Sequence, residues 1–336
     1  MRICCGCLAG LVAFLVTACS GITYGPSKPD PDTEFSPNVF NAKDAFVDFW
    51  QVASQASFER QVELWDDRVE TKYHRFYDSA VYQKQRNPQW EQQKQAKLRR
   101  FFAGLPRLYE GMLAEFSRFD GLLAAQLAKF KTTFPDASFK GLDVFAAPSL
   151  LSFSSHGDTY LDEPKSELLG FGMDRIYRDK DDTDVLYPHE LFHAYHSRAM
   201  GLSVENIENQ GSLLDLLWLE GVAVYVSGMF NPGKSDAALL MDSGLAKTCA
   251  PKLPELARRF LKIATTSMAT AQENGIYGKW FGNPPSVDKH IPKGAGFCLG
   301  LAVARKLAGT QELKQMVKWK LPEIESNVLG ALRAMK

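Results

Sequence analysis

The run His189-Glu190-Leu191-Phe192-His193 constrains this chain more than any other stretch. Residues four apart lie about one turn apart on the same face of an α-helix. Two imidazoles so placed can bind one Zn²⁺ ion, and Glu190 beside them can act as a base toward a bound water. The pattern therefore predicts a metal-binding helix, provided that the rest of the chain supplies a third ligand.

The composition is that of a folded globular protein. The chain has 336 residues, 45% of them hydrophobic, which suffices for one large domain or two ordinary ones. Thirty-nine basic residues balance thirty-nine acidic ones. This balance gives no electrostatic basis for a nucleic-acid partner.

The N-terminus has the layout of an export signal. Arg2 precedes an uncharged apolar run that ends in Val16-Thr17-Ala18-Cys19. This ending resembles the lipobox of bacterial lipoproteins. The resemblance implies removal of residues 1–18, a lipid anchor on Cys19 and, because Ser20 follows, an outer membrane location facing the periplasm. The alternative is a plain cleaved signal in which Cys19 has no role.

Residues 19–40 are predicted to form a lipidated end and a flexible tether. The segment is rich in Gly, Pro, Ser and Asp, and such a composition buries little surface. Beyond it, Cys249 and Cys298 are the cysteines left in the folded part. They could pair in an oxidising periplasm or remain separate buried thiols, and their spacing does not decide between these two states.

Apolar periodicity divides the folded part into a helical N-terminal region, 41–135, and a second region, 136–336. The first region is predicted to hold the helices Phe58–Tyr82, Trp90–Phe102 and Leu105–Phe130, with a break at Gly104-Leu105-Pro106. The second is predicted to begin with the strands Leu142–Ala147, Leu150–Ser154 and Leu168–Ile176. It continues with the helices Leu213–Phe230, Leu253–Gln272, Ala295–Leu307 and Ile324–Ala334. The predicted fold class is α+β, mainly α.

The metal-binding helix has a credible start. Thr183 and Asp184 can cap it, and acidic residues suit the positive end of its dipole. Pro188 would leave one carbonyl without its helical partner, but only near the cap. The helix prediction therefore stands.

Glu220 is the best candidate for a third ligand. Metzincin sites place a histidine six residues after the second ligand, and here that position is Ala199. Glu220 lies in a very apolar helix, where an unpaired carboxylate is costly and metal ligation accounts for it. Asp215, Glu205 and Glu208 are its rivals.

The segment Glu220-Gly221-Val222-Ala223-Val224-Tyr225, following H-E-x-x-H, resembles the gluzincin zinc metallopeptidases, and in particular bacterial proteins described as Zn-dependent proteases. The resemblance implies a zincin-like domain in 136–336, one Zn²⁺ held by His189, His193 and Glu220, and Glu190 as general base for peptide hydrolysis. It extends to Gly294–Gly300, where Phe297 replaces a frequent Tyr. Gly296, Gly300 and Ala304 recur at helical spacing and predict tight helix packing.

Other residues could complete such a site. His196 lies on the ligand face of the helix, and Tyr225, Tyr277 and His290 could donate to the oxyanion. His156 is placed in a hairpin turn. The strand Leu168–Ile176, with Gly170 and Gly172, could be an edge strand that pairs with peptide, or a buried strand.

Two other functions remain open. An envelope lipoprotein could keep a closed zinc site for structure or partner binding, with His196 or Asp215 as fourth ligand. A zinc hydrolase of non-peptide amides would share the chemistry and differ in pocket shape.

Overall fold

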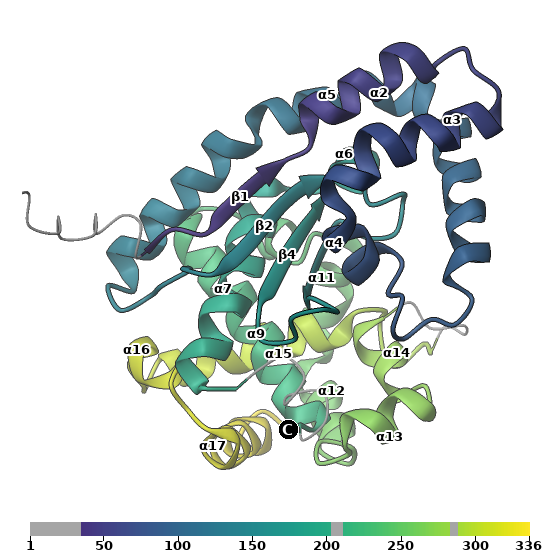
Figure 1. Cartoon of the computed structure of the whole chain (residues 1–336). Coiled ribbons are helices and arrows are strands. Elements are labelled where there is room, and N and C mark those ends of the chain that lie inside the picture. The colour runs from purple at the N-terminus through teal and green to yellow at the C-terminus, as the bar shows by residue number, and fades with distance from the viewer. Residues whose placement is uncertain (1–34, 203–210, 283–287) are drawn as a thin grey trace, which may run out of the picture.

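The computed structural model describes residues 35–202, 211–282 and 288–336 (Figure 1). The predicted signal peptide, Cys19 and most of the tether lie outside these ranges, as do Glu205 and Glu208.

The fold is α+β and mainly helical, around one small mixed sheet. Its four strands lie in the order β1-β2-β4-β3, with β1, β2 and β4 parallel and β3 antiparallel at the edge. Their bounds are β1 (Asn38–Asn41), β2 (Leu142–Ala147), β3 (Ser155–Thr159) and β4 (Glu167–Gly172). The predicted strand Leu142–Ala147 is confirmed.

Helices form most of the rest of the described chain, and in Figure 1 the group α12–α17 lies at the end of the molecule away from α2 and α3. Short π- and 3₁₀-helical turns at Asp66–Glu70, Thr71–Tyr73, Tyr77–Val81 and Ala250–Lys252 connect some of them. The helices are α2 (Lys43–Ala53), α3 (Phe58–Trp65), α4 (His74–Phe76), α5 (Trp90–Thr133), α6 (Met173–Asp179), α7 (Thr183–Met200), α9 (Leu213–Phe230), α10 (Asp236–Leu239), α11 (Ser243–Cys249), α12 (Leu253–Phe260), α13 (Met268–Glu273), α14 (Ile276–Phe281), α15 (Ala295–Ala308), α16 (Leu313–Met316) and α17 (Leu321–Arg333).

One apolar core runs through both predicted regions. Its buried members extend from Ala42 to Leu332. Phe130 of α5 lies with its ring centroid 4.9 Å from that of Phe230 on α9. The predicted boundary near residue 135 therefore does not separate two cores.

The predicted C-terminal boundary of the tether, at residue 40, is wrong. Asn38–Asn41 form β1, which pairs in parallel with residues 143–146 of β2. Phe40 stacks on Phe145 at 4.8 Å between ring centroids. These partners lie about a hundred residues away, so the local composition did not reveal them.

The predicted break before Pro106 is also wrong. α5 is one helix of 44 residues with Pro106 inside it. The proline is exposed, while Phe102 and Leu105 before it and Met112 after it are buried. Burial of several large side chains on both sides of the proline outweighs its cost of about 3 kcal/mol.

Two strand predictions and one helix prediction need correction. Leu150–Ser154 is a loop, because Leu150 and Leu151 have φ of 55° and 62°, which no strand accepts. The strand predicted at Leu168–Ile176 ends at Gly172, where α6 begins. The helix predicted at Leu253–Gln272 is two helices, α12 and α13, and Ser267 is the N-cap of the second.

α9 is the central helix of the C-terminal half. It is apolar and long enough to cross a membrane, alone among the described helices, yet 72% of it is buried inside the fold. Gly221 of α9 and Gly300 of α15 bring the two backbones into contact, since a Cβ on Gly221 would lie 2.3 Å from the Gly300 carbonyl. The predicted tight packing at Gly300 is confirmed.

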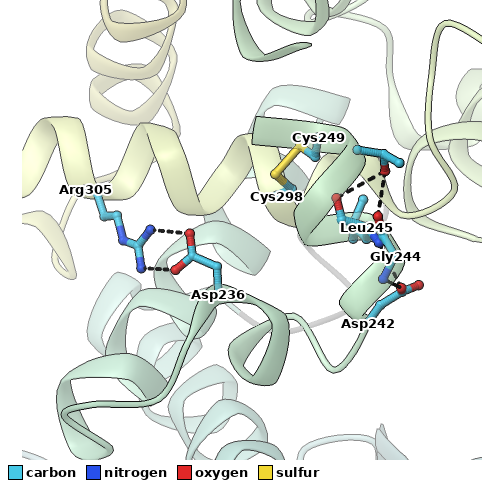
Figure 2. Close-up of a disulfide and its surroundings, with 8 residues drawn as sticks. Asp236, Asp242, Gly244, Leu245, Cys249, Cys298 and Arg305 are labelled. Atoms are coloured by element: carbon cyan, nitrogen blue, oxygen red, sulfur yellow. Dashed lines mark hydrogen bonds and ion pairs between the residues drawn. A yellow bond between two sulfur atoms is a disulfide. The ribbon is translucent and has the colours of Figure 1, made fainter. Parts of the chain in front are cut away.

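The segment from Asp236 to Cys249 is fastened to α15 at two points (Figure 2). Arg305 donates two hydrogen bonds to the carboxylate of Asp236, at 2.8 and 2.6 Å. Cys249 and Cys298 form a disulfide. Cys298 and Arg305 are seven residues apart, or about two turns of α15. The helices α10 and α11 are thus held against α15 at both ends.

Replacing both Cys249 and Cys298 with alanine is expected to destabilise the protein by about 2–4 kcal/mol. The disulfide closes a loop with a sequence separation of 49, so its removal increases the entropy of the unfolded chain. Chemical denaturation of the oxidised protein and the double variant measures the difference. A reductant should destabilise the wild type and leave the double variant unchanged; equal sensitivity of both would contradict the prediction.

Candidate metal centre

The helix α7 is held to α9 at the point where its own hydrogen bonding is interrupted. Pro188 lacks the N–H that would bond the carbonyl of Asp184, and Asn231 Nδ2 donates to that oxygen at 2.6 Å instead. Ser227 Oγ donates to the carbonyl of Val185 at 3.2 Å. The start of α7 therefore lies beside the end of α9, and the two helices run antiparallel.

The cap of α7 is Asp182, whose side chain accepts from the backbone N–H of Asp184. The predicted caps, Thr183 and Asp184, lie inside the helix. Lys234 pairs with Asp182, so that the cap is also tied to the chain that follows α9.

Replacing Asn231 with alanine is expected to destabilise the protein by about 1–3 kcal/mol, because the Asp184 carbonyl would lose its partner in a partly buried position. Asn274→Ala is the matched control. Asn274 also donates to a helix carbonyl, that of Thr270 at 3.0 Å, but on an exposed surface. Urea unfolding of both variants measures the contrast, and an equal loss in both would show that the bond has no special role.

His189, His193 and Glu220 meet between α7 and α9, and the ligand atoms of all three lie within 4.8 Å of one another. His189 Nε2 lies 3.0 Å from His193 Nε2 and 3.2 Å from Glu220 Oε2, and His193 Nε2 lies 3.5 Å from the same oxygen. Tetrahedral zinc with bonds of about 2.0–2.1 Å places its ligand atoms about 3.3 Å apart. Because these three residues could hold a metal ion, we call them the metal group.

The electrostatics of this metal group favour a positive charge at its centre. Burial raises the pKa of Glu220, but the attraction of His193 and hydrogen bonds from both histidines hold that pKa well below its ordinary value. Burial lowers the pKa of His193, and the charge of Glu220 more than offsets this, so that the pKa is raised. A carboxylate and two imidazoles thus point at one position.

Glu190 lies next to the metal group without belonging to it. Ser155 Oγ on β3 donates to Glu190 Oε1 at 2.7 Å. Glu190 lines both cavities that open beside the group. Its carboxylate is therefore fixed by a strand on one side and open to the cleft on the other.

Two cavities border the metal group. The Ser197 cavity, of about 270 Å³, is lined by Gly157, Glu190, His193, Ser197, Leu216, Leu219, Glu220, Met268, Gln272 and Tyr277. The Arg175 cavity, of about 710 Å³, is lined by Ser154, Ser155, His156, Gly157, Arg175, Asp181, Leu186, His189, Glu190, His193, Glu220, Val224, Leu239, Leu240, Met241, Tyr277, Phe281 and Phe297.

The edge strand beside the metal group is β3, not the predicted Leu168–Ile176. β4 lies between β2 and β3. A Cβ on Gly170 would lie 2.5 Å from the Phe76 ring, and one on Gly172 would lie 2.1 Å from the Phe153 carbonyl. These glycines therefore serve close packing. His156, predicted in a hairpin turn, belongs to β3.

The outer edge of β3 carries backbone groups that point away from β4. Gly172 N–H bonds the carbonyl of Ser154, and Tyr160 N–H bonds that of Ser166. Because such bonds alternate along an antiparallel pair, residues 155, 157 and 159 direct their N–H and C=O groups away from β4. Gly157 is the middle one of these and lines both cavities.

Two predicted alternatives for ligation have other roles. Asp215 forms a capping box with Ser212 at the start of α9. His196 is fully buried against Phe192, and among the described residues its ring nitrogens have no hydrogen-bond partner. Burial, together with the charge of His193, lowers its pKa to about 3. His196 is therefore a neutral core histidine.

Of the predicted donors, Tyr277 alone reaches the cleft within the described chain, where it lines both cavities. Tyr225 packs beside the apolar cluster of Val185 and Val224. His290 is exposed, with Nδ1 3.5 Å from Glu255. Phe297 lines the Arg175 cavity.

Ser155 and Gly157 are the site residues that the sequence did not reveal. Ser155 contacts Glu190, which lies 35 positions later in the chain. Gly157 reaches the cleft because β3 is an edge strand of the sheet. Neither leaves a local signal in the sequence.

Comparison of the chain with family models, curated proteins and solved structures gave no match. The geometry thus defines a class of site, two histidines and a glutamate between antiparallel helices with a further glutamate alongside, and a function has to be proposed from that geometry.

Proposed function

We propose that the protein is a zinc-dependent peptidase with a zincin-like site, anchored to the bacterial envelope through Cys19. The observation that carries this proposal is the coincidence of three ligand atoms at zinc spacing with an additional carboxylate, Glu190, on the same cleft. The absence of a fourth ligand among the described residues favours catalysis over a closed structural site.

Zn²⁺ in this group would act as a Lewis acid that lowers the pKa of water toward about 7 and polarises a carbonyl. Ser155 holds one oxygen of Glu190, and the other accepts a proton from the attacking water. Glu190 then returns this proton to the amine as the C–N bond breaks. Tyr277 lines both cavities, which supports it as the donor to the carbonyl oxygen.

The edge strand supports a peptide as the substrate. An extended peptide can pair with the outward N–H and C=O groups of residues 155 and 157, as in other cases of strand addition. The Thr159 N–H, the next in this row, already donates to Asp158. Gly157 has no atom within 4 Å of a Cβ position and leaves room for this approach. A non-peptide amide would not use this row of backbone groups.

The purified protein is expected to hold one zinc per chain and to cleave peptides, and a chelator should abolish cleavage until zinc is returned. Metal analysis and mass spectrometry of a digested peptide pool measure both quantities. A protein without metal would end the proposal. A zinc-loaded protein that cleaves no peptide would instead favour a structural role or a non-peptide amide.

A further inference from the structure

The Ser197 and Arg175 cavities meet at the metal group and form one cleft. They share the lining residues Gly157, Glu190, His193, Glu220 and Tyr277. Two of these are ligand residues and one is the proposed base. A bond that is cut there would lie in the middle of the cleft and not at a closed end.

The cleft extends in both directions along the two helices. The Arg175 cavity reaches Leu186 of α7 and Val224 of α9, whereas the Ser197 cavity reaches Ser197 of α7 and Leu216 of α9. From residue 186 to residue 197 the helix rises about 16 Å, which matches about five residues of an extended peptide. The cleft can therefore hold at least two residues on each side of the bond.

Among the described residues, Arg175 and Asp181 are the charged side chains that line the cleft outside the metal group and Glu190. Apart from that group and Glu190, the described lining of the Ser197 cavity is uncharged. In the Arg175 cavity, Arg175 already binds Asp179 and the carbonyl of Leu151. Asp181 precedes α7, and from the first residue of that helix to His189 the rise is about 9 Å.

Apolar side chains line both halves of the cleft. Leu216, Leu219 and Met268 contribute to the Ser197 cavity. Leu239, Leu240, Met241, Phe281 and Phe297 contribute to the Arg175 cavity. The first three belong to the segment from Asp236 to Cys249, which Arg305 and the disulfide hold against α15. These apolar surfaces suit Leu, Met or Phe side chains, and the Arg175 cavity presents polar groups beside them.

Building on the proposed peptidase function, we propose that the enzyme is an endopeptidase that takes the interior of an extended peptide, with apolar residues on both sides of the cleaved bond. Peptides with acetylated N-termini and amidated C-termini should be cut as fast as their free counterparts. Release of single residues from free termini only, with blocked peptides left intact, would overturn the proposal.

Binding tests the cleft separately from hydrolysis. The zinc-loaded Glu190→Gln variant should bind a blocked leucine-rich hexapeptide as tightly as the free peptide, measured by calorimetry. If the wild type cleaves nothing but this binding is seen, the peptidase function fails and the shape of the cleft stands. If the blocked peptide binds more than tenfold more weakly than the free one, the two-sided cleft is wrong.

Leu216→Arg is expected to weaken binding and cleavage of the leucine-rich peptide at least tenfold, and to shift the preference toward Asp or Glu. Leu240→Arg tests the other half in the same way. Zinc content verifies that each variant is folded. Leu122→Arg, at a partly buried leucine of α5 away from the cleft, is the matched control. Unchanged specificity in both cleft variants would refute the proposal.

Discussion

Replacing His189 with alanine is expected to weaken zinc binding more than about 100-fold and to abolish hydrolysis. Loss of a partner that only orients a ligand already costs about 10–100-fold in affinity, and His189 is itself a predicted ligand. His189 is the most buried of the three side chains, at 9% exposure, and its Nε2 lies closest to both of the others. Its removal leaves two donors and an incompletely compensated Glu220.

Metal analysis after dialysis and zinc-dependent thermal unfolding measure this loss. Zinc should raise the Tm of the wild type, because it binds the folded state, and should leave that of His189→Ala unchanged. His290→Ala, which removes an exposed histidine outside the cleft, should behave as the wild type does. A His189→Ala protein that retains one zinc with wild-type affinity would disprove the ligand assignment.

The metal group could be predicted from the sequence because its signals are local. Helical spacing alone places His189 and His193 on one face, and the apolar run around Glu220 marks a carboxylate that needs a partner. The same reasoning identified Leu213–Phe230 as a helix and Leu142–Ala147 as a strand, with the bounds that the structure shows. Each of these stretches is mainly apolar from end to end, so the apolar run and the element have the same bounds.

The parts that could not be predicted depend on distant contacts. Leu150 and Leu151 are apolar, as a strand would be, but buried Asp174 accepts from the backbone N–H groups of Ser149 and Leu151 and fixes a loop. The edge strand, Ser155–Thr159, has the polar composition of a turn and becomes a strand only by pairing with β4. Sheet order decides which strand is exposed, and no local pattern encodes it.

Pro188 lies inside a helix, where proline is usually unfavourable, and the helix forms nonetheless. A proline six residues into a helix normally weakens it, because a carbonyl loses its N–H partner. Asn231, 47 residues later in the chain than Asp184, supplies that partner. The sequence predicted the helix correctly but could not give this reason, and the bond also sets α9 against α7 so that Glu220 meets the histidines.

Glu190→Gln is expected to bind one zinc as the wild type does and to lose activity by about 10²–10⁴-fold in kcat, the usual contribution of a general base. Glutamine has nearly the same shape and can still accept from Ser155 Oγ, so the cleft and the metal group remain intact. It cannot take a proton from water at neutral pH. Zinc content and steady-state kinetics on one blocked peptide separate the two properties.

Two further variants are needed to interpret this result. Glu110→Gln, at an exposed glutamate of α5, controls for the loss of one negative charge and should leave kcat unchanged. Ser155→Ala removes the hydrogen bond to Glu190 but not the base, so kcat should fall by a smaller factor while zinc stays bound. If Glu190→Gln retains kcat within tenfold, Glu190 is not the base. The chemistry would then have to be assigned to another group in the cleft, and Tyr277, which lines both of its halves and is not a predicted ligand, would be the first candidate.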